Sequence, residues 1–281
     1  MILGHQKILQ QFQQLLSKGK MHHAFLLKGP RGVGKFKTAL EIAKLCLSED
    51  IPTSFIEKGL HPSVRILKNA EKSNIAVAEV REALSFLSYK TDKGGWKVLI
   101  IDAITDLNSQ GQNALLKDLE EPPANTLFLM IEHDGYKTLK TIESRALACY
   151  FQKLSKPDMR HFANNLNVSD QTLTLAMGSP GQLEELMKID AVNLYQKIIT
   201  SRIQNQPLNF LKDLKSDLVL KLLELSNLRA FGILEEPLEI YEGEFNDLKN
   251  LIRTMDFDTL EMFKTYRRQQ ALNLDPSSIL A

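Results

Sequence analysis

The chain has 281 residues, 43% of them hydrophobic, so it is too long for one ordinary domain and long enough to bury a substantial core. Its 35 Lys and Arg residues are balanced by 34 Asp and Glu residues, and a net charge of +1 excludes the strong positive field of an independent nucleic-acid-binding domain. Two cysteines, Cys46 and Cys149, cannot supply a four-ligand zinc site. No apolar stretch approaches the roughly 18 residues of a membrane span, so a cytoplasmic protein is expected.

Short apolar segments alternate with helical patterns in the first half of the chain. The predicted strands are 24–28, 64–67, 97–101, 127–131 and 148–152. Two of them are apolar at almost every position, which is typical of strands covered on both faces. The predicted helices are 35–47, 77–89 and 109–120. This alternation predicts a doubly wound α/β domain around a parallel sheet, over residues 1–155.

Strand patterns cease after Leu154, and the rest of the chain is predicted to be helical, with turns that contain Pro, Gly and Asn. A small helical domain is expected over 156–190, and a third, all-α domain over 191–281. Segments such as 218–228 carry apolar residues at helical spacing. Such a stripe fits an internal core and a contact with another subunit equally well.

Residues 29–35 read GPRGVGK, between a predicted strand and a predicted helix, which is the context of a phosphate-binding loop. Gly29, Gly32 and Gly34 would let the backbone turn tightly and aim its N–H groups at phosphate oxygens. Lys35 would reach the outer phosphates. A glycine turn with a chance lysine is the alternative, but the coincidence of strand, loop, lysine and helix disfavours it.

Two positions that an active ATPase of this class needs are changed. Phe36 stands where a Ser or Thr would hold magnesium, and Thr38 would point to a different side of the helix. Asp102 ends a predicted strand, where a carboxylate would orient magnesium through water, or alternatively would cap the next turn. Ala103 replaces the Glu that would polarise the attacking water. These losses predict a vestigial site that holds ATP or ADP weakly or not at all.

Three longer segments carry a family resemblance: MHHAFLLKGPRGVGK (21–35), IAVAEVREALSFLSYKTDKGGWKVLIID (75–102) and LNSQGQNALLKDLEEPPANTLFLMI (107–131). Together they resemble the delta-prime subunits of the bacterial DNA polymerase III clamp loader, within the AAA+ superfamily. The third segment is the most specific. The resemblance implies an α/β P-loop AAA+ domain, a small helical lid domain and an all-α collar domain that joins subunits in a ring. It also implies no bound zinc, because the four-cysteine module of many members is absent here.

The same resemblance suggests roles for two further residues. Ser144-Arg145-Ala146 matches the family's Ser-Arg-Cys element, whose arginine reaches into the ATP site of a neighbouring subunit. The alternative for Arg145 is a surface arginine on a loop before a strand. Ala146 in place of the cysteine is expected to affect packing only. Gln182 stands where ATPase members of the family usually carry an arginine that senses the nucleotide.

The function expected from these residues is that of a non-catalytic stator subunit of the replicative clamp loader. It would join ATPase motor subunits and the clamp-opening subunit in a hetero-pentamer, lend Arg145 to a neighbour, and meet the sliding clamp and primed DNA through the complex. An ATP-hydrolysing motor subunit of the same loader is the alternative, but it needs Ser or Thr at 36 and Glu at 103. An independent nucleic-acid binder is disfavoured, because no basic stripe with interleaved aromatic residues is present.

Overall fold

A computed structural model describes residues 4–47, 51–68, 75–88, 95–133 and 138–204. Its elements divide between two compact units, Met1–Phe162 with Gly178–Gly181, and Ala163–Met177 with Gln182–Ala281. The strands are β1 (Ala24–Gly29), β2 (Val64–Lys68), β3 (Lys97–Asp102), β4 (Thr126–His133) and β5 (Leu147–Tyr150). The helices of the first unit are α1 (Gln6–Ser17), α2 (Lys35–Leu47), α3 (Thr53–Glu57), α4 (Val77–Ser88), the 3-10 turn η1 (Ile104–Asp106), α5 (Ser109–Glu120), α6 (Lys140–Glu143) and α7 (Lys156–Ala163).

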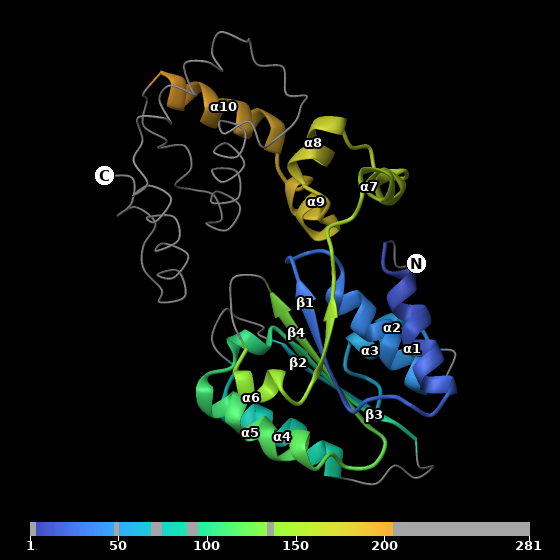
Figure 1. Ribbon diagram of the computed structural model, residues 1–281. Coiled ribbons are helices and arrows are strands. Elements are labelled where there is room, and N and C mark those ends of the chain that lie inside the picture. The colour runs from blue at the N-terminus through green and yellow to red at the C-terminus, as the bar shows by residue number, and fades with distance from the viewer. Residues whose placement is uncertain (1–3, 48–50, 69–74, 89–94, 134–137, 205–281) are drawn as a thin grey trace. The chain divides into compact units, whose positions relative to one another are not determined.

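The five strands form one parallel sheet in the order β2-β3-β4-β1-β5 (Figure 1). Parallel neighbours require crossover connections, and the helices between the strands supply them. The predicted strands are confirmed, with shifts at their ends: β4 continues two residues beyond the prediction, whereas β5 ends two residues before it. Both β3 and β4 are buried except at their carboxyl ends, as their uninterrupted apolar sequences indicate.

Apolar side chains cover the sheet on both faces, in two separate clusters. Helices α1, α2 and α3 lie on one face, and α4 and α5 pack against each other on the other face (Figure 1). The first cluster includes Phe12, Leu27, Ile42, Ile100 and Leu129. The second includes Leu26, Leu84, Leu99, Leu115 and Phe128. The predicted α/β P-loop fold, with a parallel sheet wound on both faces, is therefore confirmed.

Helix α1 was absent from the predicted elements. Its apolar residues recur at helical spacing, and Phe12 is buried with its ring centroid 4.5 Å from that of Phe25 on β1. The periodicity of an amphipathic helix in this segment is the signal that predicts it. This helix matters for the site, because it follows directly after His5.

Every described element after Tyr150 is a helix, as the sequence predicts. After α7 come α8 (Asp170–Leu175), α9 (Pro180–Leu186) and α10 (Ala191–Ile203). The boundaries 156–190 and 191–281 stay predictions, and 205–281, most of the expected collar, lie outside the described residues. Among the helices of the described residues, none has the length and apolar character needed to cross a membrane.

Candidate functional sites at two edges of the sheet

The predicted phosphate-binding loop begins at the last residue of β1 and ends at the first residue of α2. Gly29, Gly32 and Gly34 have φ angles of 138°, 78° and 102°, a region that residues with a side chain rarely adopt. A Cβ atom at Gly29 would lie 2.2 Å from the carbonyl oxygen of Phe151. The glycines therefore stand where the turn and the neighbouring chain require them.

The carbonyl groups at both ends of this loop accept hydrogen bonds from α2. The ammonium of Lys35, which is 3% exposed, donates to the carbonyls of Gly29 and Pro30, the latter at 2.6 Å. The carbonyl of Gly34 accepts from the backbone N–H of Thr38 at 2.9 Å and from its hydroxyl at 3.0 Å. The Thr38 hydroxyl is thus directed at the loop backbone, in agreement with the expectation that it would not replace the missing oxygen at position 36.

The three central carbonyls of the loop are bonded by two other segments. Nε2 of His5 lies 2.9 Å from the carbonyl oxygen of Val33. The Ser179 hydroxyl donates to the carbonyl of Arg31 at 3.1 Å, and the Gly181 N–H donates to that of Gly32 at 2.8 Å. Each carbonyl from residue 29 to residue 34 therefore has a partner within the protein. The turn 178–181 and the N-terminal segment hold the loop from outside.

The structure describes both positions at which the sequence departs from the pattern of an active ATPase, Phe36 and Ala103. Phe36 is partly buried and packs against the first core cluster, so no oxygen is available next to Lys35. Ala103 adopts the left-handed conformation, with φ 65°, and begins the turn η1 without any side-chain cap. Asp102 directly precedes this residue, and both of its expected roles, as a magnesium-orienting carboxylate and as a cap, stay predictions.

Two titratable groups stand at the carboxyl ends of strands beside this loop. Burial, together with the nearby Asp106, raises the pKa of the Asp102 carboxyl, while the charges of Arg31, Lys35 and Lys68 act in the opposite direction. His133 ends β4 and pairs in register with Gly29. Burial and the positive charges of Lys35 and Arg31 lower the pKa of His133 to about 4, so its ring is neutral at pH 7.

His133 was missed in the sequence, because the predicted fourth strand stops at residue 131 and leaves the histidine in an unassigned connection. Its Nδ1 atom is buried and has no hydrogen-bond partner within the described part of the chain. A buried polar atom of this kind is uncommon in folded proteins and calls for a partner. The signal that could have found it is its place at the end of a strand next to a phosphate-binding loop.

Arg145 lies between α6 and β5. Its Nη1 donates to the carbonyl of Thr141 at 2.8 Å and to the Ser144 hydroxyl at 3.1 Å, and its Nη2 pairs with the carboxylate of Glu120 at 2.5 Å. The Arg145 side chain stays 32% exposed. Ala146 packs against the second core cluster, as expected of a residue that affects packing. A pocket of about 290 Å³ opens beside the guanidinium, lined also by His22, His23, Leu119 and Leu147.

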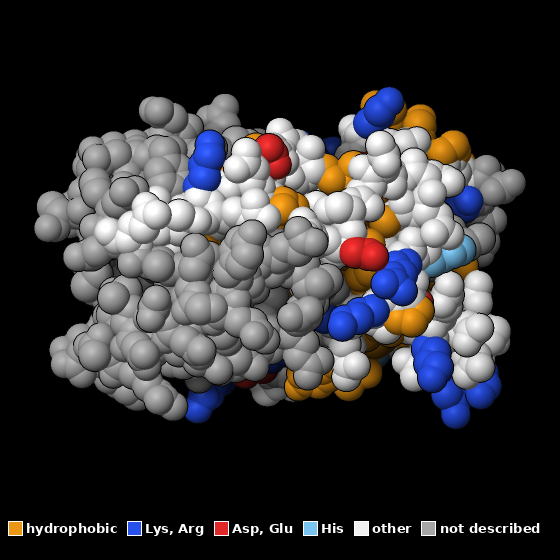
Figure 2. All heavy atoms as spheres, turned by 90° about the horizontal axis from the view of Figure 1, so that it is seen from above, with side chains coloured by type: hydrophobic (Ala, Val, Ile, Leu, Met, Phe, Trp, Pro, Cys, Tyr) orange, Lys and Arg blue, Asp and Glu red, His pale blue; other side chains and the backbone are white. Residues whose placement is uncertain are grey.

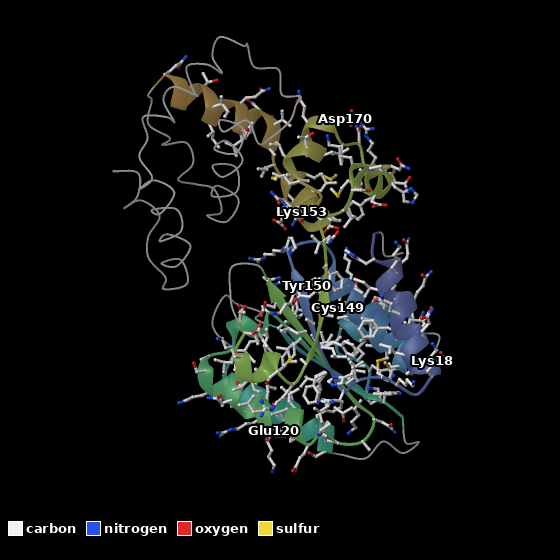
Figure 3. All side chains as sticks on the ribbon, in the orientation of Figure 1. Lys18, Glu120, Cys149, Tyr150, Lys153 and Asp170 are labelled. Atoms are coloured by element: carbon white, nitrogen blue, oxygen red, sulfur yellow. The ribbon has the colours of Figure 1, made fainter. Side chains whose placement is uncertain are left out.

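The two sites lie at opposite edges of the same sheet. Strands β1 and β5 are parallel neighbours, with Phe25 opposite Leu147 and Lys28 opposite Tyr150. The phosphate-binding loop follows the carboxyl end of β1, whereas Arg145 precedes the amino end of β5. At roughly 3.3 Å per residue the edges are roughly 17 Å apart, a separation that an arginine side chain does not span. Figure 3 labels Glu120 and Tyr150, which lie toward opposite ends of β5.

Gln182 belongs to α9 in the second unit. Its side-chain amide donates to the carbonyl of Leu175 at 3.4 Å. That contact is internal to the small helical unit, and the role of Gln182 as the replacement of a nucleotide-sensing arginine stays a prediction.

Comparison with known proteins extends these observations. Residues 4–155 match the family described as DNA polymerase III, delta subunit. The chain is 34% identical over 215 residues to DNA polymerase III subunit gamma of Buchnera aphidicola subsp. Schizaphis graminum, which is 69% of this chain and 56% of that protein. It is 29% identical over 224 residues to DNA polymerase III subunit delta' of Pseudomonas aeruginosa, 70% of this chain and 67% of that protein.

A solved structure of a DNA polymerase III gamma subunit-related protein from Thermotoga maritima is also similar, with 18% sequence identity and a TM-score of 0.49. The matched region covers 88% of this chain and 78% of the Thermotoga chain. The chain spans between 26% and 56% of the length of the first four curated relatives. The family match, by contrast, runs through the phosphate-binding loop, Asp102, His133 and Arg145. Because that match covers more than half of the 281 residues, the chain belongs to the DNA polymerase III delta subunit family.

Proposed function

We propose that this chain is the delta-prime subunit of a bacterial clamp loader, a cytoplasmic stator that does not hydrolyse ATP and lends Arg145 to the ATP site of a neighbouring subunit. One observation carries the proposal. Arg145 stands at the edge of the sheet away from the chain's own phosphate-binding loop, and this position supports a role for its guanidinium at a site on another molecule.

The identities of the relatives do not separate delta-prime from gamma, since matches of both names are comparably similar. The site residues favour delta-prime. A motor subunit needs an oxygen next to Lys35 and a carboxylate after Asp102, and this chain has Phe36 and Ala103 there. Each loss removes a separate part of the hydrolytic machinery, so together they support a degenerate ATPase.

The guanidinium of Arg145 is well suited to act in trans. Its Nη1 is held by the carbonyl of Thr141 and the Ser144 hydroxyl, which fixes the plane of the group. An arginine held in this way can present its remaining N–H donors to phosphate oxygens and stabilise the charge that develops on the transferred phosphoryl group. Glu120 balances the positive charge until a phosphate approaches.

The proposed assembly is a hetero-pentamer with ATPase motor subunits and a clamp-opening subunit, joined through the expected collar. The loader would place the sliding clamp on primed DNA, and this chain would meet DNA through the complex. Figure 2 shows the described Lys and Arg side chains of the face drawn there in small groups, with Asp and Glu side chains close to some of them. Such a distribution on that face, with a net charge of +1, gives little support to independent DNA binding.

The test is ATP hydrolysis by a reconstituted loader in the presence of clamp and primed DNA. Replacing the wild-type chain with Arg145→Ala is expected to lower hydrolysis at the adjacent site by roughly a hundredfold or more. Arg145→Lys should not restore it, because an ammonium cannot reproduce the planar fork. The matched control is Arg81→Ala, which removes an exposed arginine from α4 and should leave the rate unchanged.

The motor alternative makes the opposite prediction. If the isolated chain hydrolyses ATP and the loader with Arg145→Ala is as active as the wild type, the chain is a motor with unusual ligands, and the stator proposal is wrong.

A further inference from the structure

The loop 29–35 keeps the geometry that binds phosphate but lacks the contact that binds magnesium. Gly32 and Gly34 adopt the positive φ angles of such a loop, and Lys35 stands at its end. The next side chain, Phe36, packs into the apolar core beneath. A magnesium ion would find no oxygen at this position, since hard cations take oxygen ligands. The residues present therefore fit a phosphate group and do not fit its usual metal.

Side-chain cations supply the positive charge that a metal would bring. Arg31, Lys35 and Lys68 all lie close enough to Asp102 for their charges to favour its ionised form. Arg31 and Lys35 also act on His133. The carboxyl groups beside these cations are Asp102, which is mostly buried, and the nearby Asp106. A polyphosphate at the loop would thus meet the cations directly, without a divalent ion between them.

The loop is also shaped before any ligand arrives. Its six carbonyls, from residue 29 to residue 34, accept bonds from Lys35, Ser179, Gly181, His5 and Thr38. Binding to a preformed site loses less conformational freedom than binding that must first order a loop. On binding, Lys35 would exchange backbone carbonyls for phosphate oxygens.

His133 gives an independent indication of a ligand on this side of the loop. It stands beside Gly29 in the register of β1 and β4, and its buried Nδ1 has no partner among the described residues. A neutral imidazole offers one donor and one acceptor, so it can pair with a phosphate oxygen without needing a proton from solution.

We propose that the loop 29–35 binds a group of two or three linked phosphates without magnesium, with Arg31 and Lys35 in place of the metal. The inference rests on the proposed function in one respect only, that the site holds its ligand and breaks no bond. A free polyphosphate and a nucleotide share this chemistry, and the test separates the two sources.

Calorimetry on the full chain is the direct measurement, with ADP, ATP and pyrophosphate titrated in excess magnesium and again in excess chelator. At least one of these ligands should bind, with a dissociation constant that changes by less than about twofold between the two conditions. Lys35→Ala should weaken binding by about tenfold or more, because it removes a charge-assisted hydrogen bond. Tighter binding of ADP than of pyrophosphate would identify a nucleotide site, and equal binding a general polyphosphate site.

Phe36→Thr provides the matched gain of function. It returns an oxygen next to Lys35, so magnesium should now tighten ATP binding by about tenfold, whereas Phe36→Leu should stay insensitive to the metal. The comparison within each variant, with and without magnesium, is independent of any loss of stability from the smaller side chain.

Two results would overturn the inference: a requirement of the wild-type chain for magnesium, or no binding of ADP, ATP or pyrophosphate in either condition. Neither result would affect the stator proposal, which is tested separately by hydrolysis at the neighbouring subunit with Arg145→Ala.

Discussion

His133 shows how strongly the surroundings of one residue set its chemistry. The ring stands at the end of β4 among buried groups and beside two cations, and its pKa falls from the ordinary value of 6.5 to about 4. In the unfolded chain these influences are absent, so the unfolded state takes up a proton at a higher pH than the folded state does. Acid therefore favours unfolding through this group.

A pH series of the free energy of unfolding tests this effect. The stability contributed by the neutral ring is fully present above pH 6.5 and should be lost as the pH falls to about 4, a loss of about 3 kcal/mol. His133→Gln has no such transition, so its stability should fall less over the same range. His5 and His23, whose pKa values burial also lowers, are common to both proteins and cancel in the difference. Equal slopes for the two proteins would show that His133 is not held neutral.

Sequence reasoning at the scale of residues succeeded where the chemistry is local. The glycines, Lys35, Phe36 and Ala103 lie within or next to short motifs, and the loop and strand ends stand where those motifs place them. His133 and the partners of the loop carbonyls were not predicted. The bonds from Ser179 and Gly181 join segments about 150 positions apart, and no local pattern encodes such a contact.

The turn 178–181 is the element that braces the phosphate-binding loop. Gly181 approaches so closely that an added Cβ would lie 2.9 Å from the Cα of Gly32. Gly181→Ala is expected to push the turn from the loop, break the bond from the Gly181 N–H, and cost about 1–3 kcal/mol of stability in denaturant unfolding.

The control for this variant is Gly95→Ala, at a glycine with no atom within 4 Å of the added methyl group. It should change the free energy of unfolding by less than about 0.5 kcal/mol. If Gly181→Ala changed the free energy of unfolding as little as Gly95→Ala does, the turn would not stabilise the loop. The same variant should also weaken any polyphosphate binding, since the loop would no longer be held in shape.

The core strands and three of the helices were predictable because their apolar patterns are strong and regular. Strands such as β3 and β4 are buried along nearly their whole length, and an uninterrupted apolar segment of this length fits few structures other than a buried strand. Short helices such as α3 and α6 were not predicted, since five or four residues carry too little periodicity to be distinguished from a turn. The exposed, short β5 was misjudged at both ends, because only its pairing with β1 defines it.

At the scale of the whole molecule, the two candidate sites lie at opposite edges of one sheet. Arg145 faces outward at the amino edge of the sheet, and the phosphate-binding loop lies at the carboxyl edge. The fold class followed from the order of strands and helices along the chain. The opposite placement of the two sites required the register of β1 against β5, which no sequence pattern reveals.

This placement predicts that one substitution, Arg145→Ala, affects ATP hydrolysis by the loader without affecting the assembly of its subunits. Arg145→Ala should still enter the loader in wild-type amount, as measured by size-exclusion chromatography of the mixed subunits, because one partly exposed side chain contributes little to a large interface. Hydrolysis should nevertheless fall. A variant that loses both together would indicate that Arg145 serves mainly to join the subunits.

Because hydrogen bonds from the rest of the protein hold the loop in shape, they affect which substitutions near the loop the protein can tolerate. In an enzyme whose loop takes its shape from the bound nucleotide, loss of the metal ligand would weaken nucleotide binding and so loosen the loop. Selection would then remove such a substitution. Here the six carbonyls are satisfied from within, so the shape of the loop is not expected to depend on a metal ligand at position 36 or a carboxylate at position 103. Changes at these two positions are therefore expected to leave the loop in shape, whereas a side chain added at Gly29 would meet the neighbouring backbone.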